Sequence, residues 1–337
     1  MANPAISILI PVLNKADGLP DLLRRLTQVL DDLDESWEVL FVDDGSRDTT
    51  WRQLRDQNDA DERFRGISLS RNFGKEIAIA AGLRYANGDA VILMDADLQH
   101  PPEVLTKFVE HWRNGYQIVY GQRVDRRTDG PWRRFLAKRF YQIYNELVDT
   151  DIPEGAGDFR LLDRQAVNAL NEIGERTRFN KGLYSWIGFK SIGVRYSVVE
   201  RKHGNSKWSY INLATFAVDG LTSFTTIPLR VWSLLGIIIS LFALVCAGAY
   251  LIRILVFGID VPGFPSLIIS VMFFSGVQLI SLGVLGQYIG RIYEEVKVRP
   301  LFIVADELGG VADEKIEYPK VKAGVGWNVR GGEEAER

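Results

Sequence analysis

Two long uncharged runs in the C-terminal third constrain this chain more than any other feature. Val231–Ile252 and Phe264–Gly290 contain no charged residue, and each is long enough to cross a hydrocarbon core of about 30 Å as a helix. A pair of helices buried in a large soluble domain is the alternative, but such uninterrupted apolar runs are rare there. We therefore expect two membrane spans within residues 229–291.

The charges around these runs predict their orientation. Arg230, Arg291, Lys297 and Arg299 flank the outer ends, whereas the turn between the runs holds Asp260 and no Lys or Arg. The positive-inside rule then puts both chain ends in the cytoplasm. The first twenty residues lack a secretory signal pattern, which agrees with this orientation. We expect a multi-pass protein of the inner (plasma) membrane whose N-terminal domain is cytoplasmic.

The N-terminal part, residues 1–205, alternates short apolar runs with helical patterns. The predicted strands are Ile6–Val12, Glu38–Val42, Gly66–Leu69 and Ala90–Met94, and the predicted helices are Asp17–Leu33, Thr49–Asn58, Lys75–Ala86 and Pro102–Asn114. Strands too apolar to have a solvated face are typical of a parallel sheet covered by helices on both sides. We predict an α/β nucleotide-binding domain with its ligands at the carboxyl ends of the strands.

Two further segments mix aromatic and basic residues in a way that predicts amphipathic helices at a membrane surface. They are Trp132–Leu147, for which a solvated helix face is the alternative, and Trp208–Ile227 within a juxtamembrane region at 206–228. Residues 292–337 are expected to form a cytoplasmic strand near Leu301–Ala305 and a polar tail. A net charge of -3 argues against a nucleic-acid partner.

Paired aspartates, Asp95 and Asp97, follow the fourth predicted strand. Mg²⁺ and Mn²⁺ prefer oxygen ligands and commonly bridge a carboxylate to substrate phosphates. An isolated Asp-x-Asp can also be a simple turn or a helix cap. The metal interpretation therefore depends on the motifs around the pair.

The pair belongs to a series of six motifs along the chain. They are Ile10-Pro11-Val12-Leu13-Asn14, Val42-Asp43-Asp44-Gly45-Ser46, Ser70-Arg71-Asn72-Phe73-Gly74-Lys75, Asp95-Ala96-Asp97-Leu98-Gln99, Gly157-Asp158-Phe159-Arg160-Leu161-Leu162 and Arg201-x-His203-Gly204-x-Ser206-Lys207-Trp208. In this order, and followed by two spans, they resemble the inverting GT-A glycosyltransferases of family 2, and within them the polyprenyl-phosphate hexose synthases. Lys15 departs from the pattern, because the family often has Glu after the Asn. The resemblance implies a GT-A, Rossmann-like catalytic domain, interfacial amphipathic helices and two C-terminal transmembrane helices.

The resemblance also implies roles for individual residues. Nucleotide-sugar binding falls to Pro11, Asn14, Asp43, Asp44, Arg71, Lys75 and Asp95, and metal binding to Asp95 and Asp97. Catalytic roles fall to Asp97, Gln99 and Asp158, and lipid-phosphate binding to Arg123, Arg133, Arg134, Arg201 and Lys207. Asp158 is either a general base or a ligand of a sugar hydroxyl. The alternative to phosphate binding is an ordinary solvated surface charge, and it applies to Arg71, Lys75, Arg133, Arg134, Arg201 and Lys207.

The implied reaction is inverting transfer of a hexose to polyprenyl phosphate with Mg²⁺ or Mn²⁺. UDP-glucose is the favoured donor, and undecaprenyl phosphate is the favoured acceptor. The product would be β-linked. GDP-mannose as donor, and a non-catalytic membrane-tethered nucleotide-binding protein, are the alternatives. A lipid phosphate is already anionic at neutral pH, so positioning and charge stabilisation should matter more than a strong base. A homo-oligomer is compatible with the resemblance.

Overall fold

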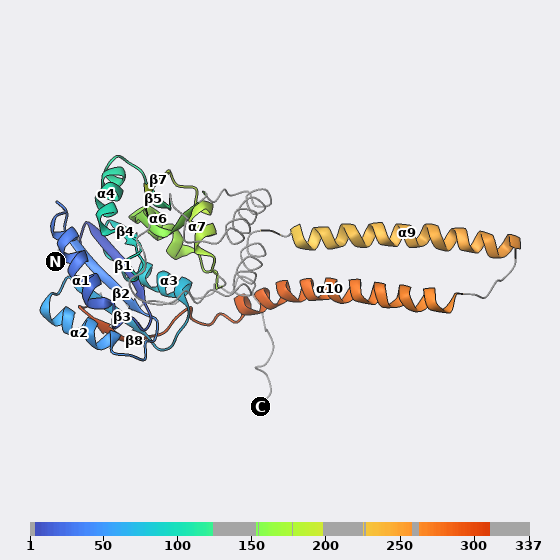
Figure 1. Cartoon of the computed structure of the whole chain (residues 1–337), viewed down its shortest axis with the longest axis horizontal. Coiled ribbons are helices and arrows are strands. Elements are labelled where there is room, and N and C mark those ends of the chain that lie inside the picture. The colour runs from blue at the N-terminus through green and yellow to red at the C-terminus, as the bar shows by residue number, and fades with distance from the viewer. Residues whose placement is uncertain are drawn as a thin grey trace, which may run out of the picture.

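The computed structural model describes residues 4–123, 153, 155–176, 178–197, 225, 227–257 and 263–310. An α/β domain occupies one end, and two long helices extend away from it side by side (Figure 1). The predicted amphipathic segment Trp132–Leu147, most of Trp208–Ile227 and the tail after residue 310 lie outside the described residues.

Strands and helices alternate through the first half of the domain, as predicted. Their bounds are β1 Ile6–Val12, α1 Leu19–Asp31, β2 Trp37–Asp43, α2 Thr50–Ala60, β3 Phe64–Leu69, α3 Lys75–Tyr85, β4 Ala90–Leu93, the 3-10 helix η1 Pro102–Val104 and α4 Leu105–Arg113. The sequence did not predict the second half, which comprises β5 Ile118–Arg123, β6 Ala156–Asp163, α6 Arg164–Glu172, α7 Asn180–Trp186 and β7 Ser191–Tyr196.

The sheet has eight strands in the order β7-β5-β6-β4-β1-β2-β3-β8. β1 pairs in parallel with β2 and β4, and β2 pairs in parallel with β3, as expected. β6, however, is antiparallel to both of its neighbours, and β8 is antiparallel to β3. The expectation of a parallel sheet is therefore wrong for β6 and β8, whereas β7 pairs in parallel with β5. β5 ends at the edge from which β6 starts back, and an antiparallel pair needs no helical crossover.

The core lies in two layers, one on each face of the sheet. Successive side chains of a strand point to opposite faces, so Ile8 packs with the cluster under α1 and α4 while Leu9 packs with the cluster under α3, α6 and α7. Both side chains are fully buried. Helices cover both faces, as the apolar character of the central strands predicted (Figure 1).

The two apolar runs form α9, Ile227–Phe257, and α10, Phe264–Val296. In the part of the chain that the structure describes, one stretch is long and apolar enough to cross a membrane, Ser270–Val296 in α10, with a mean hydropathy of 1.4. A shorter apolar stretch, Val231–Ala243, lies in α9. Large apolar side chains point outwards from both helices, among them Phe242 at 68% and Met272 at 70% exposure. A contiguous apolar surface of this kind marks a site of membrane or protein contact.

After α10 the chain returns to the domain and adds the edge strand β8, Val304–Leu308. The predicted strand at Leu301–Ala305 exists but starts three residues later, because Leu301 and Phe302 pack into the apolar cluster under α3. Asp306 in β8 accepts hydrogen bonds from Trp51 Nε1 at 2.9 Å and from Arg55 at 2.6 Å. The strand is therefore held by side chains of α2 as well as by its backbone.

Gly82 lets α3 pack closely on β1, and an added methyl group should destabilise the domain. A Cβ at Gly82 would lie 2.0 Å from Leu9 Cδ1 and 2.9 Å from Leu9 Cγ. Since Leu9 is fully buried, we predict that Gly82→Ala lowers the free energy of unfolding by about 1–3 kcal/mol, as overpacking does. Urea denaturation of the detergent-solubilised protein measures this. Gly174→Ala, where a Cβ meets nothing within 4 Å, is the matched control, and an equal loss in both variants would contradict the packing argument.

Candidate active site

Hydrogen bonds join the loops after β1 and β2 at the carboxyl edge of the sheet. The backbone N–H of Asn14 donates to Ser46 Oγ at 2.8 Å, and Asn14 Oδ1 accepts from the backbone N–H of Arg47 at 2.8 Å. Asn14 has a φ of 51°, a left-handed conformation that Asn tolerates better than most residues. Asn14 is exposed and Pro11 is partly buried. Both predicted nucleotide-sugar ligands thus lie on the rim next to the acids of β2.

Asp43 and Asp44 hold the backbone of neighbouring loops. Asp43 Oδ1 accepts from the backbone N–H of Ser46 at 3.1 Å. The two carboxylate oxygens of Asp44 accept from the N–H groups of Phe73 and Gly74, at 2.7 and 2.9 Å. Both aspartates are buried, and burial raises the pKa of Asp44. The pair thereby shapes the rim of the site, and its contact with a base or ribose stays a prediction.

Gly45 allows the loops after β2 and β3 to touch. Its φ is 73°, and an added Cβ would lie 2.7 Å from the carbonyl carbon of Arg71, so only glycine fits here without strain. The Arg71 side chain is exposed on this rim, with its guanidinium carbon 4.1 Å from the ring centroid of Phe73. Its contact with a diphosphate stays a prediction.

The acids after β4 and in β6 meet around one ammonium group. Lys75 Nζ, at the start of α3, lies 2.5 Å from Asp95 Oδ1 and 2.9 Å from Asp158 Oδ2. Burial alone would lower the pKa of Lys75, but the charges of Asp158 and Asp95 raise it well above its ordinary value. Burial would likewise raise the pKa values of Asp95 and Asp158, yet Lys75 holds both below their usual range. All three groups are therefore charged at neutral pH.

Asp97 lies two residues after Asp95 in the same loop. Its Oδ1 accepts from the backbone N–H of Gln99 at 3.1 Å. Next along the loop, His100 is buried, stacks on Phe159 with ring centroids 4.6 Å apart, and has Nε2 3.2 Å from an Nη atom of Arg123. Burial would lower the pKa of Arg123, but Tyr196 and then the charges of Asp95 and Asp97 raise it. The predicted phosphate ligand Arg123 thus lies within electrostatic reach of both acids.

A second row of polar residues, Glu76, Arg160 and Tyr184, lies next to the cluster and was not among the predicted site residues. Glu76 Oε2 accepts from the backbone N–H of Asn180 at 3.0 Å, which fixes the first turn of α7 on that of α3. The Arg160 guanidinium lies 3.7 Å from the ring centroid of Tyr184. Asp158 Oδ1, Arg160 Nε and Tyr184 Oη are buried without a hydrogen-bond partner among the described residues. Two sequence signals could have pointed to this row: Glu76 directly follows Lys75, and Arg160 lies in the same motif as Asp158.

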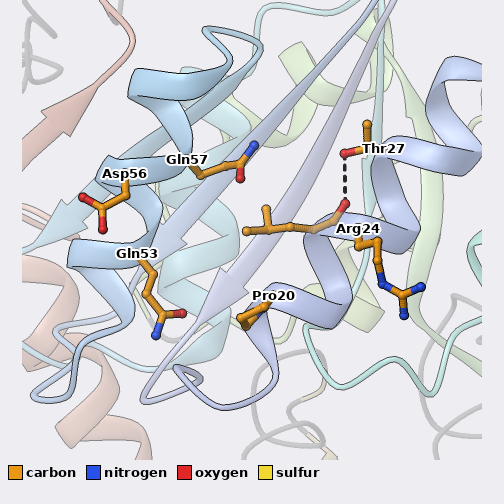
Figure 2. A pocket seen from close by; sticks show the side chains of 7 residues that line it. Pro20, Arg24, Thr27, Gln53, Asp56 and Gln57 are labelled. Carbon is orange, nitrogen blue, oxygen red and sulfur yellow. Dashed lines mark hydrogen bonds between the residues drawn. The ribbon is translucent and has the colours of Figure 1, made fainter.

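A groove between α1 and α2 lies on a different part of the domain (Figure 2). It is lined by Pro20, Leu23, Arg24, Thr27, Gln53, Asp56 and Gln57. None of these residues belongs to the predicted site. The predicted site acids lie at the ends of strands and not in this groove.

The two acids of the β4 loop have the chemistry of a partial metal site. No group of three or more His, Cys, Asp or Glu side chains that could enclose a metal occurs in the described ranges. Mg²⁺ is usually held by one or two carboxylates together with substrate phosphates and waters. Asp95 and Asp97 therefore fit a cation that completes its coordination with a diphosphate.

Four of the predicted lipid-phosphate ligands fall outside the described residues. They are Arg133, Arg134, Arg201 and Lys207. The structure does bring together Lys75, Asp95 and Asp158 from three separate elements. The roles assigned to all of these residues stay predictions.

The mixed sheet, with acidic loops at the carboxyl ends of its parallel strands, is a GT-A-like fold. Residues 7–170 match the family described as "Glycosyl transferase family 2". An uncharacterised glycosyltransferase of Synechocystis sp. is 47% identical over 90% of this chain and 96% of its own length. The SfII prophage-derived bactoprenol glucosyl transferase of Shigella flexneri is 41% identical over 89% of this chain and 97% of its own. The chain belongs to glycosyl transferase family 2 and is a glycosyltransferase.

Among solved structures, the mannosyltransferase PcManGT from Pyrobaculum calidifontis in complex with GDP-Man and Mn²⁺ is similar to this chain. It is 20% identical and covers 66% of this chain and 64% of that one, with a TM-score of 0.45.

Glu76 should make stability depend on pH. Burial, and then the charge of Asp158, raises the pKa of Glu76 from an ordinary value of 4.5 to about 7. The folded protein therefore binds this proton more tightly than the unfolded chain, so the free energy of unfolding falls as pH rises from 4.5 towards 7. We predict that Glu76→Gln, which keeps an acceptor for the N–H of Asn180, removes this part of the pH dependence.

Denaturant titrations of both proteins between pH 4.5 and 8 measure the effect. The stability of the wild type relative to Glu76→Gln should decline through this window and level off above about pH 7. Glu110→Gln on the exposed side of α4 is the matched control. Parallel curves for wild type and Glu76→Gln would contradict the assignment.

Proposed function

We propose that this glycosyltransferase moves a hexose, favouring glucose from UDP-glucose, onto polyprenyl phosphate with inversion at the sugar carbon. Undecaprenyl phosphate is the favoured acceptor, and the product is a β-linked lipid-phosphate sugar on the cytoplasmic face. The observation that carries this proposal is the 41% identity to the bactoprenol glucosyl transferase of Shigella flexneri along 89% of this chain.

The cluster at the strand ends supports the donor half of the reaction. Asp95 and Asp97 would hold Mg²⁺ or Mn²⁺, which when bound neutralises charge developing on the departing nucleotide diphosphate. Pro11, Asn14, Asp43 and Asp44 form the rim on which the nucleoside would lie. Lys75 and Arg71 would contact the diphosphate, since lysine and arginine side chains are the common phosphate ligands of proteins.

The acceptor is an anion, so the chemistry requires positioning more than deprotonation. A lipid phosphate oxygen attacks the anomeric carbon in line with the leaving diphosphate, and the carbon–oxygen bond to that diphosphate breaks as the new bond forms. Asp158 is held ionised by Lys75, so it would accept a hydrogen bond from a sugar hydroxyl. Gln99 would orient the phosphates, and Arg123, Arg133, Arg134, Arg201 and Lys207 would bind the lipid phosphate.

We further propose the domain arrangement that this acceptor requires. Residues 1–205 form the cytoplasmic catalytic domain, 206–228 a juxtamembrane segment, 229–291 two transmembrane helices, and 292–337 a cytoplasmic strand and tail. The exposed apolar surfaces of α9 and α10 support membrane insertion. Glu295, at the end of α10, accepts a hydrogen bond from the backbone N–H of Arg176 at 2.8 Å, which supports a catalytic domain held close to the membrane.

Donor profiling tests the proposal directly. The full-length protein in detergent is incubated with polyprenyl phosphate, Mn²⁺ and radiolabelled UDP-glucose or GDP-mannose, and the chloroform-soluble label is counted. Label from UDP-glucose supports the proposal, whereas label from GDP-mannose alone identifies a mannose synthase. No lipid-linked sugar from any common donor, despite nucleotide binding, would leave only a nucleotide-binding role.

Replacement of Asp97 should stop transfer without unfolding the protein. Asp97→Asn keeps the size of the side chain but removes its charge, so we predict a loss of transfer of about a hundredfold or more. The far-UV circular dichroism and membrane fraction should remain those of the wild type. Asp56→Asn, in the groove between α1 and α2, is the matched control and should retain activity. Full transfer by Asp97→Asn with both metals would refute the assigned role.

A further inference from the structure

The ammonium group of Lys75 contacts an acid that the proposed function assigns to a divalent metal. The ammonium nitrogen lies 2.5 Å from Asp95 Oδ1, and the same nitrogen lies 2.9 Å from Asp158 Oδ2. Asp95 is one of the two carboxylates that would bind the divalent ion. A divalent ion held by Asp95 would be repelled by the ammonium that contacts the same carboxylate.

We propose that Lys75 is a resident counter-cation, which the divalent ion displaces from Asp95 only when the donor diphosphate is present to receive it. The ion would then enter the site as a metal–nucleotide complex, and the metal alone would bind weakly. This inference rests on the proposed function, because it takes Asp95 as a metal ligand and a nucleotide sugar as donor.

The position of Lys75 allows the ammonium to move. Lys75 is the first residue of α3, and its side chain is 41% exposed. It follows Gly74, around which a Cβ would meet nothing within 4 Å. The four-carbon stem of a lysine carries a compact charge with many rotamers. The nitrogen can leave Asp95 and turn to a phosphate oxygen at the same rim while Asp158 stays within reach.

The charges around the cluster favour joint entry. Asp95, Asp97, Asp158 and Glu76 face Lys75, Arg123, Arg160 and Lys181. The cluster thus already holds charges of both signs. A divalent ion alone would add two positive charges to this partly buried site, and the diphosphate of a nucleotide sugar alone would add two negative ones. A complex of the two adds no net charge, so its entry carries the smallest electrostatic cost.

Manganese binding measures the effect of Lys75 apart from catalysis. The full-length protein in detergent is titrated with Mn²⁺, and the EPR signal of free Mn²⁺ is followed with and without UDP. Wild type should bind Mn²⁺ weakly alone and tightly with UDP. Lys75→Met removes the competing charge and should bind Mn²⁺ alone about tenfold more tightly or better. Lys75→Arg keeps the charge and should behave as wild type.

Two controls make the result specific. Lys107→Met, on the exposed side of α4, makes the same change in net charge away from the site. The proposal is overturned if Lys75→Met binds Mn²⁺ alone no more tightly than wild type, or if Lys107→Met gains as much. If Lys75→Met does not fold, Lys75→Gln gives the same test, because its amide is neutral and can still donate to Asp158.

Failure of the proposed function would look different. In that case wild type with UDP would bind no Mn²⁺, or Asp97→Asn would bind it as well as wild type does. An intact, Asp97-dependent site whose affinity for Mn²⁺ alone is unchanged in Lys75→Met overturns only the counter-cation role.

Discussion

The parallel pairing of β1 with both β2 and β4 is the constraint on which the site depends. Parallel strands end at the same edge of a sheet, so the loops that carry Asn14, Asp44 and Asp95 all open there. β6 starts back from that edge, antiparallel to β4, and adds Asp158. A slip of one residue in either pairing would turn the buried side chains of a strand to the other face. The catalytic geometry and the packing of the core therefore rest on one register.

A buried ion pair at the other end of the strands favours this register over shifted ones. Glu38 in β2 accepts from Arg65 of β3 at 2.5 Å, from Ser7 Oγ of β1 at 2.5 Å and from the backbone N–H of Asn87 at 2.9 Å. Such a pair adds little net stability, because desolvation of the charges offsets their attraction. Any shift of β1, β2 or β3 would nevertheless leave a buried charge without a partner, which is costly. The contacts of Glu38 at the amino ends of the strands thus help to fix the strand alignment that places the site loops at the carboxyl ends.

The sequence predicted β1 to β4 because each is a short apolar run that is buried on both faces, and it predicted α9 and α10 from their lack of charge. The sequence did not predict β6, because Asp158 and Arg160 interrupt its apolar pattern. Asp158 was therefore predicted as a site residue only through the family resemblance. The contacts of Lys75 with Asp158 and of Glu76 with Asn180 join residues 83 and 104 positions apart. No local pattern predicts such pairs, because the packing of α3 and α7 on the sheet brings them together.

The strand order has a mechanical meaning. β7 and β8 are the two outermost strands of the sheet, and the whole of α9 and α10 lies between them in the chain. On the β8 side, seven residues, 297–303, connect α10 to the sheet, and Leu301 and Phe302 among them pack into its core. A connection this short, anchored by two packed side chains, restricts the angles that α10 can adopt relative to the sheet. The direction in which the strand-end loops face is therefore coupled to the direction of α10.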